Sequence, residues 1–486
     1  MESVSHLPAI LASIIGVLCL HFIYNRLSSP LAQIPGPAIS KWTDLVYIHY
    51  WFAGKAPNYV HQLHENYGPI VRTGPNRVDI CSVDAVKEIH KTNSRFLKSP
   101  WYRTLIPNNM ETIFSTTDPN FHSARRRLLA SPISDTSLHQ HEELITGRVK
   151  MTISKMGEEI QTRGATDVFK WWLFMATDII GELSFGESFR MLEAGEKSQY
   201  TLDLEAVSAL QPIRTTFPNL VLCGKYLPLP VFQRAVAIGK RMRIYGTQSI
   251  ERYKKILAEN PSNPKKTLFT KLFDTEKGGL TDDEIQKEAQ AYIVAGSDTT
   301  AVTLTYLIYA VCGNRRIRDK LVAEVTALSK PIHDNDLRNL PYLNMVISET
   351  LRIHTAVPFG LPRAVPSEGA SFNGYFLPSG ATVSTQSYSL HRDATIFPDP
   401  YTFNPERWEN PTKEMKDIFI PFGGGSRICI GLHLARMELR LGSVLFFRQF
   451  PNAQPSDKEG MSANDMEMQS FFLMAPKGHR CLIDVE

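Results

Sequence analysis

Apolar positions recur at helical spacing through most of the chain, and at strand-like spacing in only a few short stretches. A period of three to four residues predicts helices that bury one face. Residues 70–73 and 77–81 flank Gly74-Pro75-Asn76 and predict a hairpin. Further short strands are predicted within residues 370–387, 471–474 and 479–484. The clearest helical segments are residues 134–163, 232–259, 282–312, 317–328, 342–354 and 432–447.

The N-terminal segment differs from the rest, because residues 3–25 contain no Asp, Glu, Lys or Arg. A bilayer core of about 30 Å needs about 20 apolar residues in a helix, which this segment supplies. A cleaved signal peptide is the alternative, but Glu2 stands where a basic start is expected. We favour a retained membrane anchor, and Arg26 with Lys41 favours a cytoplasmic location for the C-terminal side of this anchor.

A proline-rich elbow, Ile34-Pro35-Gly36-Pro37, comes after the apolar segment. Proline fixes φ and blocks helix continuation, so this stretch is a stiff connection. No repeat, low-complexity tract or obvious boundary divides the remaining sequence. The predicted organisation is an anchor at residues 1–26, a hinge at residues 27–40 and one body at residues 41–486.

Composition narrows the possible functions. The 486 residues are 43% hydrophobic and 21% charged, which describes a folded globular body. A net charge of +4, without a dense basic tract, argues against nucleic acid as a partner. The six cysteines show no C-x-x-C pair, so a zinc site or a disulfide framework is not expected.

The strongest chemical signal is the loop from Phe422 to Gly431, which reads F-G-G-G-S-R-I-C-I-G. Glycines let a backbone pass close to a flat ligand, and their N–H groups can tune a nearby sulfur. Residues 432–447 predict a helix directly afterwards, which places Cys429 at a positive helix end and favours its thiolate. The alternative is a glycine-rich surface loop with a buried free cysteine.

This loop fills every fixed position of F-x-x-G-x-R-x-C-x-G and resembles the haem-binding loop of the cytochrome P-450 superfamily. The resemblance is to microsomal members, and most of all to fungal members of secondary metabolism. It implies haem b, with Cys429 as the iron ligand, Arg427 on a propionate, Phe422 beside the ligand and Gly425 against the macrocycle. It also implies the family fold, mainly α with a small β region, in a haem-thiolate catalytic domain at residues 41–486. One N-terminal transmembrane helix would precede this domain.

The predicted helix at residues 282–312 begins with a capping box, Thr281-Asp282-Asp283-Glu284. A second motif interrupts this helix, where Gly296-Ser297-Asp298-Thr299-Thr300 breaks an apolar stretch. A mid-helix glycine costs about 1 kcal/mol relative to alanine, so the interruption suggests function. The alternative is a Ser/Thr-rich kink in a core helix. With Ala295, the stretch resembles the family's A/G-G-x-D/E-T motif. The resemblance implies that Ala295 and Gly296 leave space for dioxygen, that Thr299 holds it, and that Asp298 passes protons.

A further set of residues, far apart in the chain, also matches family segments. Glu349 and Arg352 are three residues apart on a predicted helix, and Arg407 lies in the F-N-P-E-R-W segment. The resemblance implies that these three form a buried structural triad. Trp408 stands where many members have Phe.

Haem propionates need cations, and residues 121–127 resemble the helix that supplies them. His122 and Arg126 fit its spacing, and Arg363 is a third candidate after Arg427 and Arg126. For Arg125 and Arg127 we favour a solvated basic face.

Electrons must come from elsewhere, because the chain carries no flavin or nicotinamide fingerprint. NADPH and a separate cytochrome reductase are therefore expected, with cytochrome b5 as a further partner, at the endoplasmic reticulum membrane with the catalytic domain in the cytosol. A basic patch for the reductase is predicted from Arg125, Arg127, Lys413, Lys416 and Arg436.

The substrate is less well defined. Family segments that line the pocket are rich in apolar and aromatic residues here, which suits a large apolar molecule such as a terpenoid, polyketide or alkaloid intermediate. Hydroxylation or epoxidation is the first hypothesis. Desaturation, rearrangement or ring expansion, oxidative coupling, a peroxygenase-like reaction and a haem carrier or sensor without oxygen chemistry remain alternatives.

Overall fold

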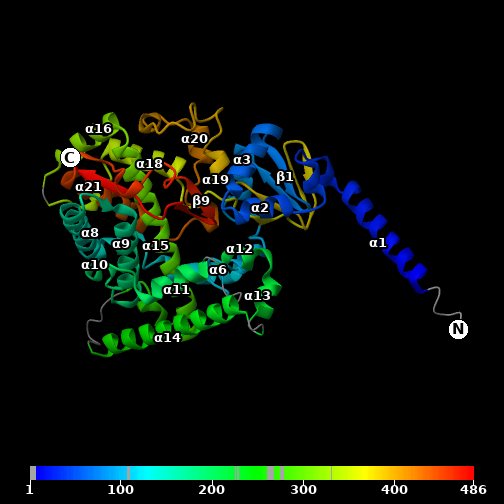
Figure 1. Ribbon diagram of the computed structural model, residues 1–486, viewed down its shortest axis with the longest axis horizontal. Helices are drawn as coiled ribbons and strands as arrows, with labels where there is room; N and C mark the ends of the chain where they lie inside the picture. Colours follow the sequence, from blue (N-terminus) through cyan, green and yellow to red (C-terminus); the bar gives the residue numbers. More distant parts are fainter. Residues whose placement is uncertain are drawn as a thin grey trace.

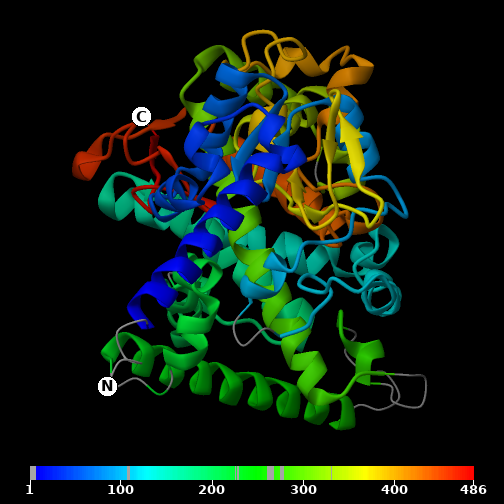
Figure 2. The same ribbon diagram turned by 90° about the vertical axis from the view of Figure 1, so that its right-hand side faces the viewer.

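The computed structural model is mainly helical, with small sheets at the edges of the helical body (Figures 1 and 2). It describes residues 7–106, 110–208, 210–224, 226, 229–259, 267–273, 279–329 and 331–485. The predicted fold class, mainly α with a small β region, is therefore confirmed.

Helix α1, Leu7–Ser28, stands away from the body beside β1 and α2 (Figure 1). Its stretch Leu11–Ser28 is long and apolar enough to cross a membrane, and none of that stretch is buried against the protein. An exposed apolar helix of this length is a candidate membrane anchor.

Four long helices form the core around α15, Asp282–Cys312, which runs through the body (Figure 2). Its start is fixed by the predicted capping box, in which the Thr281 hydroxyl accepts the Glu284 N–H and the Glu284 carboxylate accepts the Thr281 N–H. Helix α9, Val168–Phe185, packs along α15 and is buried along nearly all of its length, with only Lys170 and Glu182 partly exposed. Helices α8 (Glu142–Arg163), α18 (Pro341–Ile353) and α21 (Leu432–Gln449) complete this core.

Shorter helices surround this core. Helix α14 is the exception in length and lies across one end of the molecule (Figures 1 and 2). The remaining helices are α2 Leu45–Phe52, α3 Ala56–Tyr67, α4 Val83–Ile89, α5 Trp101–Thr104, α6 Pro119–Ala130, α7 Asp135–Leu138, α10 Met191–Ala194, α11 Gln199–Ser208, α12 Gln211–Thr216, α13 Pro218–Gly224, α14 Pro230–Glu259, α16 Arg315–Thr326, α17 Asp334–Leu337, α19 Ser387–Leu390 and α20 Lys413–Ile418.

The main sheet has the order β1-β2-β7-β4, with β1 antiparallel to β2 and β2 parallel to β7. A three-stranded sheet has the order β3-β11-β8, and two hairpins pair β5 with β6 and β9 with β10. The strands are β1 Ile70–Gly74, β2 Arg77–Ile80, β3 Thr166–Asp167, β4 Arg363–Ala364, β5 Ala370–Phe372, β6 Tyr375–Leu377, β7 Thr382–Ser384, β8 Ala453–Pro455, β9 Met468–Phe471, β10 Leu473–Pro476 and β11 Leu482–Val485.

Two predicted elements differ from the structure. The helix predicted at residues 134–163 is interrupted by a 3₁₀ turn at His139–His141, which separates α7 from α8. The edge strand predicted at residues 471–474 contains the turn between β9 and β10, where Phe472 has a φ of 87°. Both differences depend on local backbone turns that apolar spacing does not encode.

Candidate haem-thiolate site

The cysteine loop is a tight turn that ends at the start of α21. The Cys429 N–H donates to the Phe422 carbonyl at 2.8 Å, which closes the loop. Gly423 and Gly425 have φ angles of 72° and 55°, which favour glycine, and Gly431 caps α21. The Cys429 side chain is exposed rather than packed into the core.

The pKa of the Cys429 thiol reflects opposing effects. The crowding of protein atoms around the sulfur is the largest effect and raises the pKa overall; the Gly431 backbone N–H and the Arg126 guanidinium oppose this rise without cancelling it. The backbone amide and the cation favour the thiolate, as a metal-ligating cysteine requires.

Gly425 has a packing reason to be glycine in addition to its φ. A Cβ there would lie 2.1 Å from the His90 carbonyl oxygen and 2.6 Å from the Lys91 backbone, at the end of α4. The loop therefore sits directly on that helix end. Direct contact of Gly425 with a macrocycle stays a prediction.

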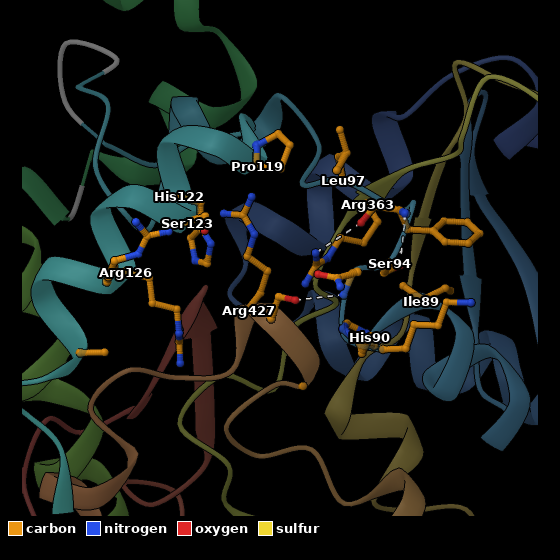
Figure 3. Close-up of a pocket in the computed structure, with 17 residues that line it drawn as sticks. Ile89, His90, Ser94, Leu97, Pro119, His122, Ser123, Arg126, Arg363 and Arg427 are labelled. Carbon is orange, nitrogen blue, oxygen red and sulfur yellow. Dashed lines mark hydrogen bonds between the residues drawn. The ribbon is translucent and has the colours of Figure 1, made fainter.

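A cavity of about 440 Å³ opens beside the loop and is lined by His122, Arg126, Arg363 and Arg427. In Figure 3, His122 and Arg126 project from α6, and Arg427 lies between that helix and Arg363. Among the described residues, each guanidinium donates only to a backbone carbonyl: Arg126 to Ile428 at 2.8 Å, Arg427 to Thr116 at 3.4 Å and Arg363 to Phe96 at 3.4 Å. The four predicted propionate partners thus meet at one cavity.

These cations lack an acidic partner. Among the described residues that line the cavity there is no Asp or Glu, and the buried Nε of Arg363 has no hydrogen-bond partner there. Burial and the neighbouring guanidinium groups lower the pKa of Arg427 to about 10 and that of His122 to about 3. A ligand with two carboxylates, such as haem b, would supply the missing negative charge.

Lys98 belongs to the same cluster and escaped the sequence analysis. Its side chain is buried, and burial together with Arg363 and Arg427 lowers its pKa well below the usual range. The ammonium donates to the Phe114 carbonyl and lies 4.2 Å from the Tyr102 ring centre. Nothing in the local sequence distinguishes it from a surface lysine.

The predicted oxygen motif lies in the middle of α15. Ala295 is exposed, and the Thr299 hydroxyl donates to the Ala295 carbonyl at 2.7 Å, which leaves its lone pairs free to accept. Gly296 has a different surrounding from the one expected, because a Cβ there would lie 3.0 Å from Ile180 on α9. Gly296 therefore allows the two core helices to approach. Space for dioxygen beside Ala295 stays a prediction.

Asp298 is half-buried, and burial with the nearby Glu205 raises its pKa to about 6, against the effect of Lys197. Lys197 and Glu205 form an exposed ion pair at 2.6 Å. Asp298 therefore lies on α15 close to a solvent-exposed pair of charges. A carboxyl group that titrates near neutrality at such a place can exchange protons with water.

Glu438 on α21 is a second buried carboxyl close to this motif. Burial raises its pKa to about 8, and a hydrogen bond with Thr300 opposes the rise. Its Oε2 has no partner among the described residues. The sequence analysis missed Glu438, because an acid in an amphipathic helix is usually exposed.

The predicted triad is assembled, with the side chains of Glu349 and Arg352 fully buried and that of Arg407 7% exposed. Arg352 makes two hydrogen bonds to Glu349, at 2.8 and 2.9 Å, and Arg407 adds one at 3.0 Å. Trp408 donates its indole N–H to the same carboxylate at 2.9 Å. The tryptophan that departs from the family pattern thus satisfies the carboxylate further, which a phenylalanine could not do.

Arg125 was placed on a solvated basic face, and that prediction is wrong. Its side chain is buried and pairs with Glu284 at 2.8 Å and Glu288 at 3.5 Å, both on α15. Glu288 also accepts the Ile113 backbone N–H, and burial raises its pKa to about 7. Arg125 therefore joins α6 to α15 and does not belong to an exposed patch. Arg127, Lys413, Lys416 and Arg436 are exposed.

Comparison with known proteins agrees with this geometry. A family model described as cytochrome P-450 matches residues 37–482, so the chain belongs to the cytochrome P-450 family, whose members bind haem. It is similar to the cytochrome P-450 monooxygenase tazI of Aspergillus terreus, with 54% identity over 472 residues that cover 96% of each chain. The monooxygenase orf2 of Aspergillus niger is 46% identical over 489 residues and 100% of each chain. The monooxygenase stcB of Emericella nidulans is 36% identical over 466 residues, 94% of this chain and 88% of the relative.

The chain is therefore an oxidoreductase of the cytochrome P-450 monooxygenase family, which incorporates oxygen from dioxygen. Its relatives are fungal, as the resemblance implied. The family also implies a redox partner and an apolar substrate in general terms.

Proposed function

We propose that the protein is a membrane-anchored monooxygenase that hydroxylates or epoxidises a large apolar intermediate of fungal secondary metabolism. Electrons would come from NADPH through a separate reductase. The observation that carries this proposal is an exposed Cys429 thiol at the start of α21, beside a cavity of cations without an acid among its described lining residues.

In this proposal the residues have three roles: binding the iron, binding the haem propionates and transferring protons. Cys429 ligates the iron, and the guanidinium groups of Arg126, Arg363 and Arg427 hold the propionates together with the neutral imidazole of His122. Lys98 lies next to Arg363 and Arg427 and supports this group. When bound, haem supplies the activation of dioxygen.

Residues of helix α15 would deliver protons to the bound dioxygen. The Thr299 hydroxyl, held by its bond to Ala295, presents an acceptor oxygen toward the exposed face of α15. Asp298, with a pKa of about 6, supplies protons from the side of Lys197 and Glu205. A haem carrier or sensor would not need this relay, so a catalytic role is the better explanation.

The anchor and the reductase surface are proposed from the exposed residues. Helix α1 would hold the body at the endoplasmic reticulum membrane, with the catalytic domain in the cytosol. The reductase patch is reduced to Arg127, Lys413, Lys416 and Arg436, because Arg125 is buried in ion pairs. Cytochrome b5 would use the same kind of surface.

Turnover with isotopically labelled dioxygen tests the reaction class. The holoenzyme is supplied with NADPH and purified reductase, and the product of a terpenoid or polyketide panel is examined by mass spectrometry. One labelled oxygen atom per product is expected. Product without label would indicate desaturation, rearrangement or coupling, and labelled-peroxide turnover without reductase would indicate a peroxygenase.

A further inference from the structure

A second cavity, of about 220 Å³, lies between α2, the main sheet and α12. Four aromatic side chains line one part of it: Tyr47, Trp51, Trp101 and Phe359. The rings of Trp101 and Phe359 are stacked, with centres 5.6 Å apart and an angle of 14° between planes. Trp51 lies 4.9 Å from Phe359 and 6.2 Å from Trp101, so the three rings form a continuous wall.

This wall continues toward two more aromatic residues that do not line the cavity. Phe472 lies 6.0 Å from Trp101 and 6.4 Å from Phe359, and Phe114 lies 5.7 Å from Phe472. Phe472 has a φ of 87°, an uncommon conformation for a residue other than glycine. Rings from five separate segments therefore converge here.

The other part of the cavity is polar. It is lined by Arg77, Asp79, Ser99, Ser384 and Gln386. The Arg77 Nε is buried and has no hydrogen-bond partner among the described residues. A buried donor without a partner is costly, and a ligand oxygen would satisfy it.

The charged side chains of this cavity already have hydrogen-bond partners. Arg77 pairs with Asp44 at 2.7 Å, and Asp79 pairs with His64 at 2.9 Å. An anionic ligand would find no unpaired cation among the described lining residues, which favours a neutral ligand. Gly360 brings the backbone close to this polar end, since a Cβ there would lie 2.8 Å from the Cβ of Ser384 and 3.2 Å from the Asp79 Oδ2.

We propose that this cavity binds a flat, neutral, aromatic ring system that carries hydroxyl or carbonyl oxygens, and that the substrate belongs to this class. The assignment of that class to the substrate rests on the proposed monooxygenase function. The aromatic wall that Trp51, Trp101 and Phe359 form packs against the ligand's rings, and Arg77 with Ser384 donates to its oxygens. Among the candidate classes, oxygenated aromatic polyketides fit this chemistry, and saturated terpenoids do not.

Calorimetry on the holoenzyme with matched two-ring probes tests the proposal directly. We expect 2-naphthol to bind about tenfold more tightly than decahydro-2-naphthol, because only the aromatic probe stacks on the wall. Naphthalene and 2-naphthalenesulfonate are expected to bind more weakly than 2-naphthol, since one lacks the oxygen and the other needs a cation. Equal binding of 2-naphthol and the saturated probe would overturn the proposal.

Variants locate the binding in this cavity. Phe359→Leu is expected to weaken 2-naphthol about tenfold, whereas Phe359→Tyr keeps the ring and the affinity. Ser384→Ala is expected to weaken 2-naphthol and to leave naphthalene unchanged. Phe376→Leu is the control, because Phe376 is an exposed ring on β6 outside the cavity. Unchanged 2-naphthol binding in both Phe359→Leu and Ser384→Ala would exclude this cavity.

The two proposals fail in different ways. An intact thiolate spectrum without 2-naphthol binding would contradict the cavity and leave the monooxygenase function standing. Loss of the thiolate spectrum with 2-naphthol binding still dependent on Phe359 would contradict the function and leave the cavity as a ligand site.

Discussion

Two buried groups of charges in this protein have opposite character. In the triad, the carboxylate of Glu349 receives bonds from Arg352, Arg407 and Trp408, so each charge has a partner. The cavity beside the cysteine loop is lined by Arg126, Arg363 and Arg427 and by no acid among the described residues, and Lys98 lies close to Arg363 and Arg427. Removing one partner from a satisfied group destabilises the fold, whereas an unsatisfied group of like charges is completed by a ligand.

The largest change in the free energy of unfolding is expected from a substitution in the triad. Glu349→Gln leaves two buried guanidinium groups without their counter-ion, so the free energy of unfolding is expected to fall by about 3–5 kcal/mol. Urea unfolding of the variant measures this change. Glu158→Gln is the matched control, because Glu158 forms an exposed pair with Lys155 and is expected to cost about 1 kcal/mol or less. A similar loss in the free energy of unfolding in both variants would contradict the claim that the buried triad matters more for stability than an exposed ion pair.

Removing a charge from the cavity beside the cysteine loop is expected to lower haem affinity without lowering the free energy of unfolding. Arg427→Gln removes a like charge, so the free energy of unfolding of the haem-free protein should stay constant or rise. Haem affinity should fall by about 10- to 100-fold, the value of a charge-assisted hydrogen bond. Haem transfer to an acceptor protein measures the affinity.

Lys91→Gln is the control for this variant, since Lys91 lines the same cavity and already pairs with Glu88 at 2.7 Å. A haem affinity that is unchanged in Arg427→Gln would contradict the assignment of the cavity to propionates.

A change of intermediate size is expected at Asp298, in the way the free energy of unfolding depends on pH. Its folded pKa of about 6 lies above the ordinary 3.8, so the folded protein holds this proton more firmly than the unfolded chain does. The free energy of unfolding should therefore fall as pH rises from 3.8 to about 6, and Asp298→Asn should remove that fall.

The same variant tests the relay. In the wild type, product formed per NADPH should be highest where Asp298 is protonated and should decrease above its pKa of about 6. Asp298→Asn should give a low yield at every pH and release peroxide instead. A wild-type yield and profile in the variant would show that protons enter by another route.

The smallest effect is expected on the exposed basic patch. Lys413→Glu with Lys416→Glu on α20 should slow electron transfer from reductase about two- to fivefold at low salt, because exposed charges mainly steer association. Stopped-flow reduction of the haem at two ionic strengths measures this. Lys240→Glu on α14, at the other end of the molecule in Figure 1, is the control. Equal rates in all three proteins would exclude the patch.

The sequence predicted the features that depend on local motifs. The cysteine loop, the capping box of α15 and the spacing of Glu349 and Arg352 each lie within a few residues, so one short stretch defines the geometry. The span of α15 was predicted as residues 282–312, because a cap and a long apolar period define both ends.

Burial of charged residues was not predictable in the same way. Arg125, Lys98 and Glu438 are ordinary residues in their local sequence, and only the packing of distant helices encloses them. Helix α9 was also absent from the predicted helices, because a helix that is buried on nearly every side has a mostly apolar sequence without a clear periodic pattern. These features depend on tertiary contacts between segments more than a hundred residues apart, such as Arg125 with Glu284.

The most direct test concerns the sulfur of Cys429. The absorption spectrum of the reduced, carbon-monoxide-bound protein is compared for the wild type, Cys429→Ser and Cys223→Ser, which changes another exposed cysteine. We predict the thiolate-type band in the wild type and in Cys223→Ser, and its loss in Cys429→Ser with the helical content retained. A folded Cys429→Ser protein that binds haem and keeps the wild-type band would contradict the account.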